Sequence, residues 1–288
     1  MATATHRPPD QALPRPLIAI GVPCVGVLLI AFFLIRGFPY GKLGELIANR
    51  IEQSHGIHLA IGDVRPALQL AGLALEATQL RVEFPGRAPQ QIDRALVRPA
   101  WSLSWFTGEP AFHVELESPS GNTHGTLRWN GAVFWTGTIR DARPELPPIA
   151  DWIPIGGFEG ALDATLDVSM GEAGLEGPVE FEIRDGSISM PGFSAPLPFE
   201  SLTGTASLGG DAYVKLSSLS FEGPLASGSG SGKIGRAEPL EKAPIGFEFR
   251  VEIKPELTRT VRGGGAIIKP DGTALVRISG TVAEQKVR

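Results

Sequence analysis

The sequence predicts a mainly β protein, in which a single N-terminal transmembrane helix precedes a curved antiparallel β-sheet built as a meander. We also expect one or two short helices and a sheet that is groove-shaped. The 288 residues include 36 glycines and 25 prolines, about 21% against an average near 12%, which disfavours long helices. Apolar and polar residues also alternate with a period of two, as strands with one wet face do. One long uncharged run lies near the N-terminus.

This uncharged run covers residues 16–35 and is flanked by arginines. Its 20 residues would form a helix of about 30 Å, the thickness of the hydrocarbon core of a bilayer. A cleaved signal peptide and a buried helix are the alternatives, but the run lacks a small-x-small cleavage site. Basic residues lie on both sides of the run, so counting them does not decide its orientation. A long domain that follows a single N-terminal span is commonly exported, and we expect export here. We expect a cytoplasmic tail at 1–15 and a transmembrane helix at 16–36.

Residues 37–56 show a helical pattern directly after the expected anchor. Pro39 suits the first turn of a helix, and Gly56 suits its end. Between them, apolar residues recur at spacings of three and four, namely Leu43, Leu46, Ile47 and Ile51. The charges on this segment leave no basic face for a lipid surface. We therefore expect a membrane-proximal helix that covers part of the sheet.

The remaining segment, 57–284, is predicted to form the β domain. Apolar and polar residues alternate around 57–61, 162–168, 179–183 and 247–253. Asn130-Gly131, Asp185-Gly186 and Asp271-Gly272 are signals for two-residue turns between strands. Prolines between 144 and 154 stiffen a stretch that could divide this domain into lobes at 57–143 and 157–284.

The apolar side of the later strands is the candidate binding surface. Few helices are available in the sequence to cover it. The sheet must therefore close on itself, pack on a second sheet, or leave a groove for lipid or a partner. The candidate groove residues are Leu162, Leu166, Val168, Val179, Phe181, Ile183, Phe247, Phe249 and Val251.

Metal ligands and acid–base pairs cannot be assembled from the sequence. Cys24 is the only cysteine, so neither a disulfide nor a cysteine metal cage can form within the chain. His55 and His58 lie close in sequence, but the expected helix ends between them. Asp163 and Asp167 share a strand face about 13 Å apart, which is too far for a coupled acid–base pair. We therefore expect no metal site.

The sequence also matches neither a phosphate-binding motif nor a nucleophile motif. The run 228–233 looks like a phosphate loop, but Ser227 and Ile234 occupy positions where such a loop needs glycine and a hydroxyl. No serine has the strand-turn-helix setting of a nucleophile elbow. We expect no catalytic residue, no cofactor and no enzymatic activity. A net charge of −5 also argues against a nucleic-acid partner.

Two glycine-rich runs, 227–232 and 263–265, are poor in side chains. One hypothesis places them at an exposed sheet edge, where a strand from another chain could add by main-chain hydrogen bonds. The alternative is that their glycines only make loops flexible, or that they belong to a strand of small residues. The sequence leaves these interpretations open.

The order of these segments resembles the type II secretion system protein N family and, more distantly, the AsmA-like proteins of the bacterial envelope. The similarity consists of glycines, prolines and alternating aliphatic residues rather than an invariant motif. Its structural positions include Pro39, Gly56, Pro66, Gly72 and Gly280. The stretches that carry it are 38–43, 57–61, 63–66, 72–76 and 275–282.

The resemblance implies a single-pass protein of the bacterial inner membrane with a periplasmic β domain. Its implied function is that of a non-enzymatic accessory component of a type II secretion system, with other secretion subunits and inner-membrane lipid as partners. The alternative is an AsmA-like groove protein that binds or transfers lipid, and a hydrolytic or carbohydrate-active sheet enzyme is a third. No catalytic residue is carried over.

Overall fold

A computed structural model describes residues 29, 33, 36–69, 72–83, 89–100, 105, 107–144, 158–171, 174–189, 196–254, 269 and 271–287. Nearly all of the expected anchor at 16–36 lies outside these residues. Within them, no helix is both long enough and apolar enough to cross a bilayer.

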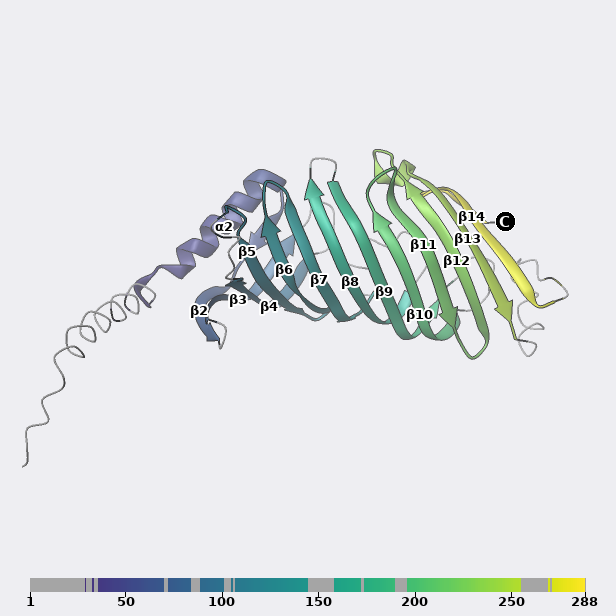
Figure 1. The fold of residues 1–288 in the computed structure, drawn as a ribbon, viewed down its shortest axis with the longest axis horizontal. Helices are drawn as coiled ribbons and strands as arrows, with labels where there is room; N and C mark the ends of the chain where they lie inside the picture. Colours follow the sequence, from purple (N-terminus) through teal and green to yellow (C-terminus); the bar gives the residue numbers. More distant parts are fainter. Residues whose placement is uncertain are drawn as a thin grey trace, which may run out of the picture.

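The described chain forms one antiparallel sheet of 15 strands that follow one another almost entirely in sequence order. Figure 1 shows them side by side along the long axis, with helix α2 (Tyr40–His55) at one end and the C-terminus at the other. The first strands, β1 (His58–Ala60) and β2 (Asp63–Gln69), both pair with β3 (Gly72–Glu83). The others are β4 (Gln90–Pro99), β5 (Ala111–Ser118), β6 (Gly121–Trp129), β7 (Val133–Ala142), β8 (Phe158–Gly171), β9 (Gly174–Ile188), β10 (Leu197–Leu208), β11 (Ala212–Glu222), β12 (Ala226–Gly235), β13 (Pro244–Ile253), β14 (Thr273–Thr281) and β15 (Gln285–Val287).

Helix α2 corresponds to the predicted membrane-proximal helix. It begins after Pro39 and ends at Gly56, whose left-handed conformation lets its N–H donate to the Glu52 carbonyl. The helix packs against β1 and β2. Gly44 is buried at this contact, where a Cβ atom would lie 3.1 Å from Val64 Cγ2. The helix therefore covers the first strands, as expected.

Register shows that one face of the sheet is apolar over eleven consecutive strands. Directly opposed residues of an antiparallel pair lie on the same face, so paired residues can be followed from strand to strand. One such row from β4 to β14 comprises Val97, Val114, Gly125, Gly137, Leu166, Val179, Ala206, Leu216, Gly232, Phe247 and Ile278. The neighbouring row on the other face comprises Thr138, Thr165, Glu180, Thr205 and Ser218. We call these the apolar face and the polar face.

The hydrophobic core occupies the apolar face of β9–β14. Leu202, Ala226 and Val251 are completely shielded from solvent there. The rings of Phe247 and Phe249 stack at a centroid distance of 6.1 Å. The apolar face of this part of the sheet is therefore removed from water. The sheet also continues across the expected lobe boundary, because β7 and β8 pair along most of their length; residues 145–157 themselves lie outside the described part.

Glycines of β12 make room for aromatic rings in this core. A Cβ atom on Gly230 or Gly232 would lie less than 3.0 Å from the ring of Phe249 or Phe247. The same holds for Gly228 beneath Phe221 and for Gly204 beneath Phe181. The rings therefore lie across neighbouring strands, directly over backbone that carries no side chain.

Two sequence-based predictions need correction. The glycine-rich run 227–232 is not at an edge, because it forms most of β12, which pairs with β11 and β13 on its two sides. The run 263–265 lies outside the described residues. Asp185-Gly186 is not a turn between strands but lies inside β9, where Asp185 has a positive φ of 50° and pairing with β8 is irregular. The signal marks a bulge that bends a long strand.

Replacing Gly230 by alanine tests the packing role of the β12 glycines. We expect Gly230→Ala to lower the free energy of unfolding by about 1–3 kcal/mol, because the Phe249 ring must move. The matched control is Gly246→Ala on β13, where no atom lies within 4 Å of the new Cβ, and its change should stay within about 1 kcal/mol. Urea unfolding followed by circular dichroism measures both. Equal destabilisation by the two substitutions would contradict the packing role.

Candidate functional site

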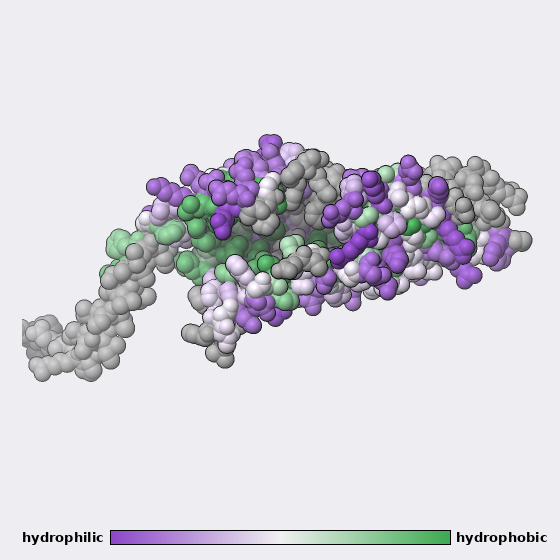
Figure 2. All heavy atoms as spheres, turned by 90° about the horizontal axis from the view of Figure 1, so that it is seen from above, coloured by the Kyte–Doolittle hydropathy of each residue, from purple (hydrophilic) through white to green (hydrophobic). Residues whose placement is uncertain are grey.

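The apolar face is open to solvent in the N-terminal half of the sheet. Seen from above in Figure 2, hydrophobic residues gather inside a hollow between hydrophilic rims. We call this hollow the trough. It is lined by half-buried side chains of β5–β9 on the apolar face: Val114, Leu116, Leu127, Trp135, Ile139, Leu166, Val179 and Phe181.

The floor of the trough is flattened by glycine. A Cβ atom on Gly125 or Gly137 would come within 3.0 Å of the Trp135 indole, so this ring lies over two adjacent strands. The side chains on the apolar face of β5–β9 are almost entirely hydrocarbon, with hydroxyls only at Ser118 and Thr123. Such a surface offers contact area but almost no hydrogen bonds, and it is therefore suited to an apolar ligand.

All nine predicted groove residues lie on the apolar face, but they divide between the core and the trough. Val168, Ile183, Phe247, Phe249 and Val251 are buried, and Leu162 packs against the core cluster. Leu166 and Val179 remain half-buried in the trough, and the half-buried Phe181 lies at its border, where it packs against the core cluster. The lining from β5–β7 was missed by the sequence analysis, although the alternation at 112–116 and 133–139 was a usable signal.

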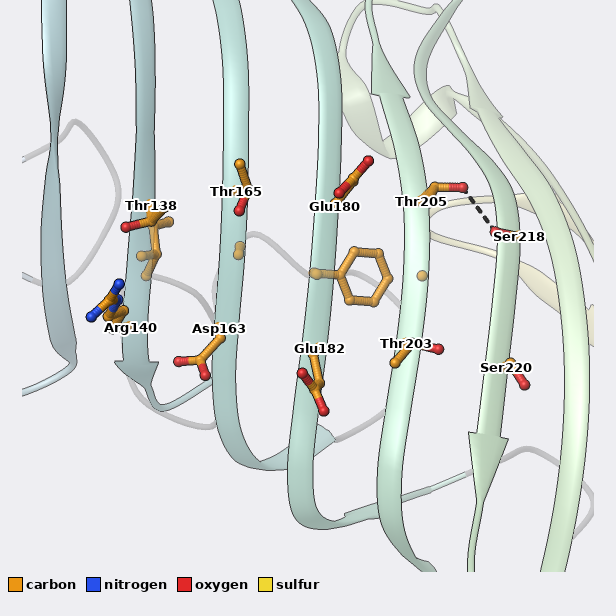
Figure 3. Close-up of a pocket in the computed structure, with 14 residues that line it drawn as sticks. Thr138, Arg140, Asp163, Thr165, Glu180, Glu182, Thr203, Thr205, Ser218 and Ser220 are labelled. Carbon is orange, nitrogen blue, oxygen red and sulfur yellow. Dashed lines mark hydrogen bonds between the residues drawn. The ribbon is translucent and has the colours of Figure 1, made fainter.

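The polar face carries shallow depressions. The depression in Figure 3 has a volume of about 510 Å³ and is lined by polar side chains that stand in two rows across β7–β11. Thr205 and Ser218 hydrogen-bond across it at 2.8 Å. A second depression of about 780 Å³ lies on β11–β14. Both are open hollows on a hydroxyl-rich sheet surface.

The acidic residues considered from the sequence have ordinary partners on this face. Asp163 accepts a hydrogen bond from Arg184 Nη2 at 2.6 Å, and Asp167 accepts one from the Thr136 hydroxyl at 2.9 Å. The two carboxylates thus have different hydrogen-bond partners. They belong to the solvated face of β8.

The histidines are also dispersed. His58 lies 3.3 Å from Glu52, His113 contacts Thr126 and His124 contacts Thr138. His113 and His124 are therefore not partners of each other. Within the described residues, no three His, Cys, Asp or Glu side chains come together to hold a metal ion.

The strongest electrostatic cluster ties together β2–β5 on the polar face. Glu76 is only 9% exposed; its two oxygens accept hydrogen bonds from Arg65 at 3.0 Å and from Arg94 at 2.6 Å. Arg94 also donates to Glu117 at 3.0 Å. The hydrogen bond from Arg65, with that from Arg94, lowers the pKa of Glu76 below its ordinary value. The cluster holds the start of the sheet without contributing to the trough.

This cluster predicts a pH-dependent contribution to stability. Because the folded-state pKa of Glu76 is lowered, its stabilisation is present above the unfolded-state value of about 4.3 and is lost as the pH falls through the folded-state pKa. Glu76→Gln should therefore destabilise the protein more at pH 7 than at about pH 3. Urea unfolding at both pH values measures the difference.

The matched control is Glu248→Gln, which removes an ion pair with Arg277 of 2.9 Å between two exposed side chains. It should change stability by less than about 1 kcal/mol. An effect of Glu76→Gln that is the same at both pH values would show that the carboxylate charge is not what holds β2–β5 together.

Comparison with protein-family models, with curated proteins and with solved structures gives no match for this chain. The resemblance to the type II secretion system protein N family therefore stays a prediction from the sequence. The functional assignment has to rest on the geometry of the trough and on the chemistry of its lining.

Proposed function

We propose that this chain is a non-enzymatic, AsmA-like groove protein of the bacterial envelope that holds lipid hydrocarbon chains in the trough. One observation carries the proposal: the apolar face that forms the core of β9–β14 continues without interruption into β5–β8, where side chains such as Val114, Trp135 and Leu166 stay partly exposed. Large contiguous apolar surfaces of this kind mark binding sites, because leaving them in water costs about 25 cal/mol per Å².

The chemistry of the lining favours a hydrocarbon ligand. Trp135, Leu166 and Val179 supply apolar contact, whereas a peptide in the trough would lose hydrogen bonds to water that the lining cannot replace. The dimensions also agree. Four steps between the five strands β5–β9, at about 4.8 Å each, give about 19 Å, and one leaflet of a bilayer core is about 15 Å thick. A lipid chain can thus lie along the trough with its head group at the hydrophilic rim.

A role as an accessory component of a type II secretion system is the second proposal. It is supported by the sequence resemblance and by the order of helix α2 and a meander sheet. Both proposals place the chain in the inner membrane with its β domain in the periplasm. They differ in the occupant of the trough, which is lipid in the first and a secretion subunit in the second.

Photo-crosslinking in cells separates the two proposals. A photoreactive amino acid at Val179 faces the trough, and the same amino acid at its neighbour Glu180 faces solvent on the polar face. We expect mass spectrometry to find lipid adducts at position 179 and few at position 180. Capture of a secretion subunit at 179 instead of lipid would favour the second proposal. Equal labelling from both positions would contradict both.

A further inference from the structure

Four large apolar side chains form an exposed row at the end of β6–β9. They are Trp129, Val133, Met170 and Leu175, and they are 58%, 37%, 54% and 40% exposed. Each is paired in register with the next, from Trp129 to Val133, to Met170 and to Leu175. They therefore stand side by side on the apolar face, and we call this row the lip.

The lip sits where two hairpins end in glycine-rich turns. Trp129 and Val133 flank the β6–β7 turn, while Met170 and Leu175 flank the β8–β9 connection, which leaves the sheet at the same end of the strands. A Cβ atom on Gly131, Gly171 or Gly174 would meet no atom within 4 Å. These glycines thus border open space, and the exposed lip residues lie beside them.

The lip leads directly into the trough. The next row of the apolar face contains Leu127 and Trp135, which line the trough, and Val168, which is buried beside them. Further along, Leu202 is fully buried. Hydrocarbon could pass from the lip to the trough entirely over apolar side chains, without crossing a polar barrier.

We propose that the lip inserts into the surface of a lipid bilayer and that lipid enters the trough there; this inference rests on the proposed lipid-binding function. A Trp side chain favours the membrane–water interface, and the exposed Arg128, which precedes it on the polar face of the same strand end, can meet lipid phosphates. The acidic Glu176 next to Leu175 is paired with Arg236 at 4.0 Å, which reduces repulsion from an anionic surface. A protein partner would not require the unbroken connection to the trough.

The test uses the full chain in a Cys24→Ser background, reconstituted into phosphatidylcholine vesicles. An environment-sensitive fluorophore is attached at Met170→Cys in the lip and, as the matched control, at Thr165→Cys on the polar face of the same strand. We expect blue-shifted emission at position 170 that is quenched by nitroxide-labelled lipid, and neither effect at position 165. Unshifted emission at 170 would overturn the inference. A blue shift without quenching by labelled lipid would also overturn it, because the lip would then be covered by protein.

A second measurement separates failure of the lip from failure of the trough. The double variant Trp129→Ser/Met170→Ser removes apolar surface from exposed positions, so the fold should persist, which a thermal melt checks. The photoreactive amino acid at Val179 then reports lipid in the trough. In vesicles, the double variant should give about tenfold fewer lipid adducts than the unaltered lip. In lipid–detergent micelles, which deliver lipid without a bilayer, the two should give equal yields.

Equal adduct yields in vesicles would overturn the lip as the place where lipid enters and would leave the lipid-binding trough intact. If neither the unaltered protein nor the double variant gives lipid adducts, either in vesicles or in micelles, the proposed function is overturned instead. In that case the fluorophore at position 170 still decides whether the lip meets the bilayer.

Discussion

The apolar face that extends from β4 to β14 has to be removed from water, and the described structure depends on how this is achieved. Helix α2 makes its main contacts with β1 and β2 and does not form a layer over the later strands. Over β9–β14 the apolar face forms a core in which Leu202 and Val251 are fully buried. Toward β5 the same face stays partly exposed and lines the trough.

Glycine has a packing role in this arrangement. Alternate residues of β12 are glycines on the apolar face, and the rings of Phe221, Phe247 and Phe249 occupy the space above them. The same device places Trp135 over two glycines in the trough floor. Because each ring lies flat over glycine backbone, the aromatic side chains form broad, flat surfaces. This explains why a chain so rich in glycine still forms a regular sheet rather than loops.

The mainly β meander and the apolar face of the strands at 162–168, 179–183 and 247–253 could be predicted from the sequence, because alternation with a period of two directly encodes which side chains share a face. The nine candidate groove residues accordingly lie together. Their division between core and trough could not be predicted, since Val251 and Val179 have the same local pattern, yet Val251 is fully buried and Val179 is only half-buried. Asp185-Gly186 shows a related limit: its positive φ serves a bulge within β9, whereas local sequence alone favours a turn.

The central claim is that one apolar face is buried in the core of β9–β14 and accessible at the trough, for example at Leu166. The most direct test is the rate at which a bulky hydrophilic thiol reagent labels single cysteines at Leu166 and Val251 in lipid-free protein, again with Cys24→Ser. The account predicts rapid labelling at 166, protection of 166 by added lipid, and labelling at 251 only on unfolding. Comparable rates at the two positions would contradict an open trough beside a closed core.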